Sequence, residues 1–468
     1  MDIKSSFIVL TTLLSLFGVR AIASENAVTF EDNVKPIFKA RCFKCHGEDE
    51  HKSGLSLHTY SAVLKGGSGG EVVKPSRANT STLFLAITHA SDDIEYMPPK
   101  SDKIPDAEIE IVKQWIMGGL LEKVGGESKG TQRNLSFTGS VGVKPKDPAM
   151  PQGLPDPKLP DTKRPFAVTA LASSPWAPLV AVAGHERVFL KNTATGEILG
   201  VLPFPEGTPF VLRFSRDGAL LLAAGGKGGA SGKAVLYDVK TGKRLADYGD
   251  ETDVVLAADL SPDQSLIAIG GPSKTVKVFN TKDGKLLYKI TKHTDWITSL
   301  EFSPNGAQLA TADRNGGIHV WDAKSGGIAF SLSEHKDSIR DMAWRPDGAF
   351  LASASEDGQL IIWDMKDGWP ANTLSDVHKP KPQGKVYGKL LAGVLALAWT
   401  SEGKLISAGR DGAVRLFDSH GNKVAAAESI ARLPTKVAAS YDGQIIMVGD
   451  ALGTLKFLGV KKDKLVER

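Results

Sequence analysis

The pattern of apolar and polar positions divides the chain into regions of different character. Residues 29–122 carry apolar positions at helical spacing, separated by turns rich in glycine and proline. Residues 128–164 are dense in proline, glycine and lysine and lack apolar periodicity, which is typical of a mobile linker. From residue 166 onward, short β-rich runs alternate with turn residues. The pattern predicts a small all-α region, a linker and a large all-β region.

Three helices are predicted in the first region, over 30–41, 81–89 and 105–120. The last of them starts near a proline, carries acidic residues in its first turn and ends at two glycines. Those residue types favour the start and the end of a helix. Between the helices, the glycine-rich run 66–70 lacks the Gly-Lys-Ser/Thr ending of a phosphate-binding loop, so we interpret it as a flexible turn.

The all-β region is built from a repeat. Asp263, Asn305 and Asp347 occupy equivalent turns and are each 42 positions apart. Each turn separates two apolar strands, and a third strand ends in an aromatic–acidic pair such as Trp363-Asp364. A period of about 40–45 residues with four strands per unit is typical of a β-propeller. We expect seven units, which begin near residues 166, 208, 252, 294, 336, 390 and 432.

Two of these units repeat a set of polar side chains that can relay hydrogen bonds from a loop histidine through a strand hydroxyl to an indole N–H. The members are His335, Ser353, Asp357 and Trp363 in one unit, and His293, Thr311, Asn315 and Trp321 in the preceding one. With these residues the region resembles the WD-repeat family. The resemblance implies a seven-bladed propeller that binds partners through the loops of one face.

The boundaries of the other units are less regular. Trp369–Lys389 is predicted to be an insertion between the fifth and sixth units. The last predicted strand, at 461–466, is polar, so the segment before Phe166 is a candidate for sealing the ring.

The N-terminus has the pattern of an export signal. Lys4 precedes an apolar run at 7–19, and small residues follow at 21–23. We therefore expect residues 1–23 to be removed and the mature protein to lie in the periplasm of a Gram-negative-type bacterium. The run is short for a membrane span, and retention as an N-terminal anchor is the alternative. The resulting division is 1–23 signal peptide, 24–125 small helical domain, 126–164 linker and 165–468 propeller.

Charge and cysteine content narrow the function classes. The net charge of +4 lacks the concentrated basic excess of a nucleic-acid-binding protein. The chain has two cysteines, Cys42 and Cys45, which excludes a disulfide framework.

Cys42-Phe43-Lys44-Cys45-His46 has the Cys-x-x-Cys-His spacing of a c-type haem attachment site. Residues three apart share one face of a helical turn, so both thiols can bond to one porphyrin edge while His46 faces the iron. Two alternatives remain open. A redox dithiol normally accompanies a βαβ pattern, which is not visible here. A zinc site would need further ligands, and His51, His58 and His89 are the available histidines.

Methionine is a common second axial ligand of c-type haem. Met97 is the best candidate, because the two prolines that follow it stiffen its loop. Met117 lies inside the last predicted helix and is expected in the core or at its rim. His89 or His58 would give bis-histidine ligation instead.

The region 30–122 resembles the cytochrome c domain of planctomycetes and related bacteria. The landmarks are Phe38-Lys39-Ala40-Arg41, Cys42-x-x-Cys45-His46-Gly47, Gly54-Leu55-Ser56-Leu57, 64–70, 81–84, Met97-Pro98-Pro99-Lys100 and 111–119. The resemblance implies one covalent haem c held by Cys42, Cys45, His46 and Met97. Proteins of this kind also place the cytochrome domain before a propeller.

Together these features favour a periplasmic one-electron carrier rather than an enzyme, with the propeller as a docking platform for redox protein partners. A haem iron with both axial positions filled exchanges electrons but has no open site for a substrate. The alternatives are a haem-based sensor or oxidoreductase with a labile distal ligand, or a propeller scaffold in which the haem is secondary. No transmembrane segment is expected after signal cleavage.

Overall fold

The structure of the protein is a computed structural model. It describes residues 28–75, 78–91, 93–99, 101–123, 144–154, 166–380, 392–428, 430, 432–461 and 464–468. The chain forms two compact units, residues 1–132 and 133–468, which we describe separately. The predicted signal peptide and parts of the predicted linker and insertion lie outside the described residues.

The first unit is helical, as the sequence predicts. Its helices are η1 (Phe30–Val34), α1 (Lys35–Arg41), α2 (Phe43–His46), η2 (Lys52–Gly54), α3 (Tyr60–Lys65), η3 (Ala78–Thr80), α4 (Thr82–Thr88) and α5 (Asp106–Met117). Helices α4 and α5 lie within the predicted spans 81–89 and 105–120, and η1 with α1 covers 30–41. The glycine-rich run forms a tight turn in which the Gly67 and Gly70 backbones pair.

Phe30 is the centre of the helical core. Its ring is fully buried and lies 5.6 Å from the Trp115 ring and 5.8 Å from the Tyr60 ring. The backbone N–H of Phe30 and the indole N–H of Trp115 both donate to the Leu121 carbonyl. These contacts join the beginning of the unit to its end. The segment that carries the candidate site lies between these two points in the sequence.

The second unit contains strands in sheets of four, each an antiparallel meander. The first sheet has β1 (Leu171–Ser173), β2 (Leu179–Gly184), β3 (Arg187–Asn192) and β4 (Ile198–Pro203). The second has β5 (Thr208–Phe214), β6 (Leu220–Lys227), β7 (Ser231–Asp238) and β8 (Arg244–Glu251). The third has β9 (Ala257–Leu260), β10 (Leu266–Gly270), β11 (Val276–Asn280) and β12 (Leu286–Ile290).

The later sheets follow the same order. The fourth has β13 (Ile297–Phe302), β14 (Gln308–Asp313), β15 (Ile318–Asp322) and β16 (Ile328–Leu332). The fifth has β17 (Ile339–Trp344), β18 (Phe350–Ser355), β19 (Leu360–Asp364) and β20 (Trp369–Leu374). Then come β21 (Val394–Trp399), β22 (Leu405–Gly409), β23 (Val414–Phe417), β24 (Lys423–Ala427), β25 (Pro434–Ala439), β26 (Ile445–Asp450), β27 (Leu455–Lys461) and β28 (Lys464–Glu467).

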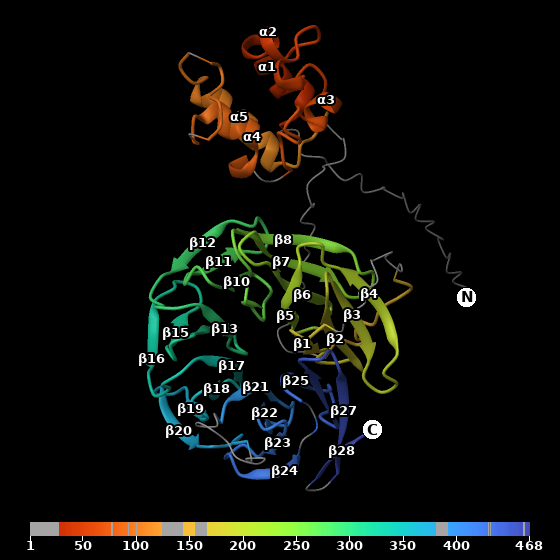
Figure 1. Cartoon of the computed structure of the whole chain (residues 1–468), viewed down its shortest axis with the longest axis vertical. Coiled ribbons are helices and arrows are strands. Elements are labelled where there is room, and N and C mark those ends of the chain that lie inside the picture. The colour runs from red at the N-terminus through yellow and green to blue at the C-terminus, as the bar shows by residue number, and fades with distance from the viewer. Residues whose placement is uncertain are drawn as a thin grey trace, which may run out of the picture. The chain divides into compact units, whose positions relative to one another are not determined.

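The sheets are arranged around a common centre (Figure 1). The first strand of each meander faces this centre, and β1, β5, β9, β13, β17, β21 and β25 contact one another in chain order. Strand β25 also contacts β1, so the ring of contacts is closed.

The closing meander, β25–β28, consists entirely of C-terminal strands. It joins the preceding sheet through one parallel pair, Ala426 with Lys464, so that β21–β28 count as one eight-stranded sheet. On its other side the Val168 N–H donates to the Asp450 carbonyl at 3.0 Å, and the Thr435 hydroxyl donates to the Val168 carbonyl at 2.6 Å. Beside the contacts between β25 and β1, the ring is therefore held on this side by hydrogen bonds to Val168, just before β1.

Two segments differ from their expected character. Trp369, the predicted start of an insertion, instead begins strand β20, because the fourth strand of that sheet continues to Leu374; residues 381–391 lie outside the described residues. Residues 144–154, assigned to the linker, pack onto the all-β unit. The Gln152 N–H donates to the Lys240 carbonyl, and Leu154 packs against the core of the first sheet.

Candidate functional site

The two cysteines and His46 occupy a single helical turn. Helix α1 ends at Arg41, Cys42 lies at the junction, and α2 follows directly. The backbone N–H groups of Cys45 and His46 both donate to the Cys42 carbonyl, at 3.1 and 2.9 Å. Both thiols are free and partly buried. The predicted arrangement of two thiols and an imidazole on one turn is therefore present.

His46 is held by the strand-like segment that follows it. The side chain is buried, and its Nδ1 lies 3.1 Å from the Leu55 carbonyl oxygen. The Leu57 N–H donates to the His46 carbonyl at 2.7 Å. If Nδ1 carries the proton, Nε2 keeps a free lone pair, and Nε2 makes no hydrogen bond with any described residue. A second hydrogen bond of this kind orients metal-binding histidines in general.

The environment of Cys42 does not favour dithiol chemistry. Burial raises the pKa of the Cys42 thiol to about 11, with a further contribution from the nearby Glu108 carboxylate. Redox-active cysteines need a lowered pKa, because the thiolate is the nucleophile. Cys42 is therefore a protonated thiol at neutral pH.

An ion pair links the motif to the last helix of the unit. Arg41 Nε and Nη2 donate to the two carboxylate oxygens of Glu108, at 3.1 and 2.9 Å. The pair is partly exposed, so its contribution to stability is small. Its geometric effect is to fix the end of α1, next to Cys42, against the start of α5.

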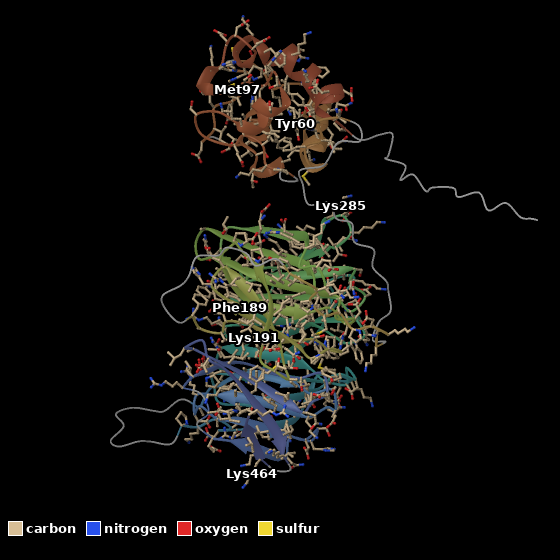
Figure 2. All side chains as sticks on the ribbon, turned by 90° about the vertical axis from the view of Figure 1, so that its right-hand side faces the viewer. Tyr60, Met97, Phe189, Lys191, Lys285 and Lys464 are labelled. Atoms are coloured by element: carbon tan, nitrogen blue, oxygen red, sulfur yellow. The ribbon has the colours of Figure 1, made fainter. Side chains whose placement is uncertain are left out.

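Met97 lies in the helical unit, where it is labelled in Figure 2. Its N–H donates to the Ala86 carbonyl at 3.1 Å, which ties its loop to α4. The side chain is partly buried and packs against the same apolar core as Cys42 and Phe43. Met117, by contrast, is 52% exposed at the end of α5, although Trp115 and Ile116 beside it are buried.

The two histidines that could replace Met97 already have partners. His89 Nε2 lies 3.3 Å from the Met97 carbonyl oxygen, and its ring stacks on Tyr96 at 4.6 Å. His58 Nε2 lies 3.6 Å from a Glu48 carboxylate oxygen. Within the described part of the chain, no group of three or more His, Cys, Asp or Glu side chains is arranged to hold a metal ion. Of the helices that the structure describes, none has both the length and the apolar character needed to span a bilayer.

In the all-β unit, the polar network predicted around His335 is present. His335 Nδ1 lies 2.9 Å from Asp357 Oδ2, and Nε2 lies 2.7 Å from Ser353 Oγ. The Trp363 indole N–H donates to the same hydroxyl at 2.8 Å. Burial alone would raise the pKa of Asp357, but hydrogen bonds from His335 and the backbone outweigh it and lower that pKa. Every polar atom of the relay is paired.

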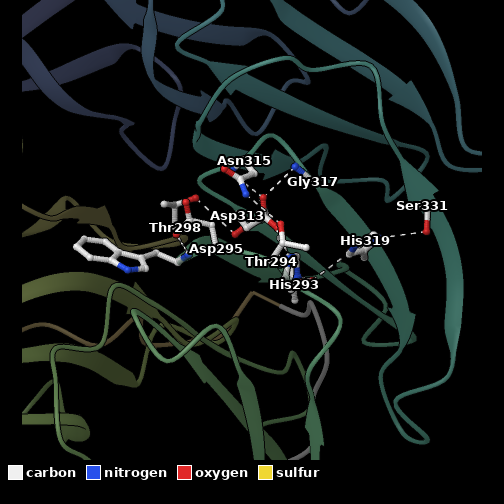
Figure 3. A network of polar contacts seen from close by, with 12 residues as sticks. His293, Thr294, Asp295, Thr298, Asp313, Asn315, Gly317, His319 and Ser331 are labelled. Carbon is white, nitrogen blue, oxygen red and sulfur yellow. Dashed lines mark hydrogen bonds and ion pairs between the residues drawn. The ribbon is translucent and has the colours of Figure 1, made fainter.

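In the network one unit earlier, the residue that pairs with the histidine Nδ1 is not the predicted one (Figure 3). His293 Nδ1 lies 2.9 Å from Asp313 Oδ2, while Thr311 bridges His293 Nε2 and the Trp321 indole as expected. Asn315, which we assigned to the acidic position, instead donates through its side-chain amide to the Thr294 hydroxyl. Asp313 ends strand β14 two residues earlier, and its carboxylate reaches the imidazole and caps the following turn.

A third network was not predicted. His378 Nδ1 lies 2.7 Å from Asp411 Oδ1, and Nε2 lies 2.7 Å from Ser407 Oγ. Phe417 replaces the indole, and Arg415 pairs with Asp411 at 2.7 Å. Arg415 Nη1 also lies 2.6 Å from His378 Nδ1, so Nδ1 donates to Asp411 in one tautomer and accepts from Arg415 in the other. Burial lowers the pKa of His378, so the imidazole is neutral in this network.

Comparisons with known families agree with both parts of the fold. The family model of Planctomycete cytochrome C matches residues 42–101, a span that begins at Cys42 and includes Cys45, His46 and Met97. The model of the WD domain, G-beta repeat, matches residues 284–322, 326–364 and 381–418. The chain joins a planctomycete-type cytochrome c domain to WD repeats. No curated protein gives a significant match.

The three matched WD repeats end at Asp322, Asp364 and Asp418, and the polar networks belong to the same repeats. The third match begins at residue 381 and therefore does not include His378. The histidine of the third network is evident only from the structure, since it lies 29 positions before its hydroxyl partner, compared with 18 in the other two.

Proposed function

We propose that the protein is a one-electron carrier in which the cytochrome c domain holds one covalent haem c and the WD-repeat region docks the redox partner. The observation that carries this proposal is the turn at Cys42–His46. It presents two free thiols and an imidazole whose Nδ1 is fixed by the Leu55 carbonyl. This donor set fits a c-type haem, which needs two thioether bonds and a histidine nitrogen.

Each residue has a distinct part in this proposal. Cys42 and Cys45 would anchor the haem covalently, and His46, oriented by Leu55, would supply a nitrogen ligand. Met97, in a loop tied to α4, would supply a sulfur ligand. When bound, the haem supplies a one-electron couple between the ferric and ferrous states.

The histidine partners favour Met97 as the distal ligand. His89 and His58 each have Nε2 close to a protein oxygen, whereas the partly buried Met97 side chain packs against the apolar core. If haem is bound, Met97 would supply its second protein ligand, and electron exchange would then require no ligand loss.

The WD-repeat region supports a docking role. The closed ring of inner-strand contacts fits a seven-bladed propeller, with the eight-stranded sheet counted as two blades. Export to the periplasm is part of the same proposal and is supported by the apolar run at 7–19 with small residues after it.

The test is the visible spectrum of the full chain matured with a bacterial haem-attachment system. We expect a haem that survives denaturation, a low-spin spectrum and a weak far-red charge-transfer band of methionine–iron ligation. The band should be lost in Met97→Ala and kept in Met117→Ala, a matched control because Met117 is exposed.

Other outcomes would contradict specific parts. A covalent haem with a high-spin spectrum and rapid cyanide binding would replace electron transfer by sensing or catalysis. A band that persists in Met97→Ala would assign the distal position to another residue. Absence of covalent haem would overturn the proposal as a whole.

A further inference from the structure

One face of the all-β unit carries a pocket of about 510 Å³. Its apolar lining comes from the second and third sheets and from the loops that follow each of them: Phe210, Val254, Leu256, Pro272 and Trp296. A pocket of this size is within the range of natural binding sites. It belongs to the same face as the histidine networks, because Trp296 follows His293 in the loop between β12 and β13.

The second sheet builds one wall of the pocket. Strands β6 and β7 have eight residues each, whereas β10 and β11 of the next sheet have five. The extra length carries the hairpin tip at Gly228 and Gly229 to the pocket. The Gly229 N–H donates to Asp253 Oδ1 at 3.0 Å, which fixes the tip to the loop after β8. A side chain at either glycine would extend into open space.

Trp296 is a rigid, exposed edge of this pocket. The residue is 41% exposed, which is unusual for an indole in a loop that is otherwise held at both ends. Its carbonyl accepts from the Arg314 N–H at 3.0 Å, and the next residue, Ile297, donates to the Gly271 carbonyl at 3.0 Å. The Arg314 guanidinium lies 5.2 Å from the centre of the indole ring. Tryptophan and arginine are the residue types most enriched at interface hot spots.

The charges around Trp296 favour an acidic partner. Lys274, Lys292 and Arg314 are exposed on the adjoining loops and form no ion pair with any described residue. Two carboxylates lie nearby: Asp253 accepts from the Gly229 and Val254 N–H groups, and Asp295 accepts from the Trp296 N–H. Accepting a hydrogen bond does not remove the charge of a carboxylate, so the three cations exceed these two acids by one. Unpaired cations beside an apolar pocket attract a negatively charged segment and raise its association rate.

We propose that this pocket, with Trp296 as its anchor, binds an acidic segment of a partner protein that inserts one aromatic or large aliphatic side chain. The inference deepens the docking role proposed above and rests on it. It places docking where the long β6–β7 hairpin and Trp296 line one pocket, and it assigns the partner's chemistry.

The test uses the full haem-loaded chain and fluorescein-labelled synthetic peptides, with binding measured by fluorescence anisotropy. The probe has a central phenylalanine flanked by glutamates; one control peptide has alanine at the centre, and a second has lysines in place of the glutamates. We expect the glutamate–phenylalanine peptide to bind at least about tenfold more tightly than either control, with affinity that falls as salt rises.

The variants test the anchor directly. Trp296→Ala should weaken the glutamate–phenylalanine peptide at least about tenfold, the loss typical of a hot-spot residue. Trp369→Ala is the matched control, because Trp369 is 68% exposed on β20 and lies outside the pocket. Arg314→Gln should weaken binding about threefold and reduce its salt dependence, and this second variant leaves the pocket wall intact.

Three results would overturn the inference: no binding of the glutamate–phenylalanine peptide to the wild-type chain, equal binding of the alanine peptide, or equal losses in Trp296→Ala and Trp369→Ala. The same samples give the haem spectrum. A normal low-spin spectrum without peptide binding rejects this docking site alone, whereas an absent or high-spin haem rejects the electron-transfer proposal independently.

Discussion

His46 in the helical unit and His335 in the all-β unit are both buried, but their imidazoles are used differently. His335 has a hydrogen-bond partner at each nitrogen, Asp357 on one side and Ser353 on the other. His46 has one, the Leu55 carbonyl at Nδ1. His46 Nε2 is not among the buried, unpartnered side-chain atoms of the described residues, so this oriented nitrogen is open to solvent and accessible to a ligand.

The same contrast extends to the two regions as a whole. The described WD-repeat networks pair each imidazole with a carboxylate and a hydroxyl, which is a structural use of histidine. In the helical unit the two thiols and His46 Nε2 have no covalent or hydrogen-bonded partner among the described residues. The unpaired atoms of the helical unit are available to bind a ligand, whereas the paired histidines of the all-β unit stabilise the fold. Each prediction below changes one of these two groups of residues.

The largest effect is expected from removing both thiols. In Cys42→Ala/Cys45→Ala we expect complete loss of covalent haem, because no other cysteine exists in the chain. The measurement is haem staining after denaturing electrophoresis, with Ser353→Ala as a variant that keeps the stain. Retention of covalent haem in the double variant would contradict the assignment of the motif.

Ser353→Ala should instead destabilise the all-β unit. It leaves His335 Nε2 and the Trp363 indole N–H buried without a partner, at a cost of about 2–4 kcal/mol of unfolding free energy. Urea unfolding followed by tryptophan fluorescence measures the cost. Ser331→Ala, which removes an exposed hydroxyl bonded to His319, should cost less than about 0.5 kcal/mol. Equal losses of unfolding free energy in Ser353→Ala and Ser331→Ala would show that the buried relay stabilises the fold no more than an exposed hydrogen bond does.

The charge on Asp357 should contribute stability only above acid pH. Its folded pKa is lower than the unfolded value of 3.8, so the contribution is fully present above pH 3.8 and is lost as the pH falls through the folded pKa. Asp357→Asn keeps an acceptor for His335 but not the charge. The stability gap between wild type and variant, from urea unfolding at a series of pH values, should therefore narrow on acidification; a widening gap would contradict the sign.

The smallest effect concerns His319. Burial, with a contribution from the nearby His293, lowers the pKa of His319 from 6.5 to about 4. Below pH 6.5 the unfolded chain binds a proton that the folded chain does not, so stability falls between pH 6.5 and about 4. In His319→Gln the change in unfolding free energy per pH unit should become smaller, by an amount that corresponds to less than about one bound proton. An unchanged slope would assign the pH dependence to other groups.

The sequence predicted features that depend on spacing and missed those that depend on backbone geometry. The Cys-x-x-Cys-His spacing predicted that Cys42, Cys45 and His46 share one helical turn, and the 42-residue period predicted the four-stranded sheets. The Leu55 carbonyl that orients His46 could not be found, because a backbone acceptor leaves no side-chain signal. Asn315 was assigned by its distance from His293, but the turn allows Asp313 to reach the imidazole first.

His378 was missed for a different reason. The extra residues between β20 and β21 move it away from the spacing that the other repeats share, and we had placed it inside the predicted insertion. Its network has no indole, so the aromatic–acidic signal at Phe417-Asp418 gave no reason to search for a histidine further upstream. The structure shows that His378 belongs to the network, because contact in three dimensions does not require a fixed loop length.

The position of the closing meander at the end of the sequence determines when the ring can close during synthesis. Strand β1 begins at Leu171, and the strand that it must contact, β25, begins at Pro434, about 260 residues later. At roughly 5–20 residues per second, the first sheet waits on the order of ten to fifty seconds for its neighbour. The helical unit, whose closing contact joins Phe30 to Leu121, is complete long before that. It therefore has time to fold while the ring is still open.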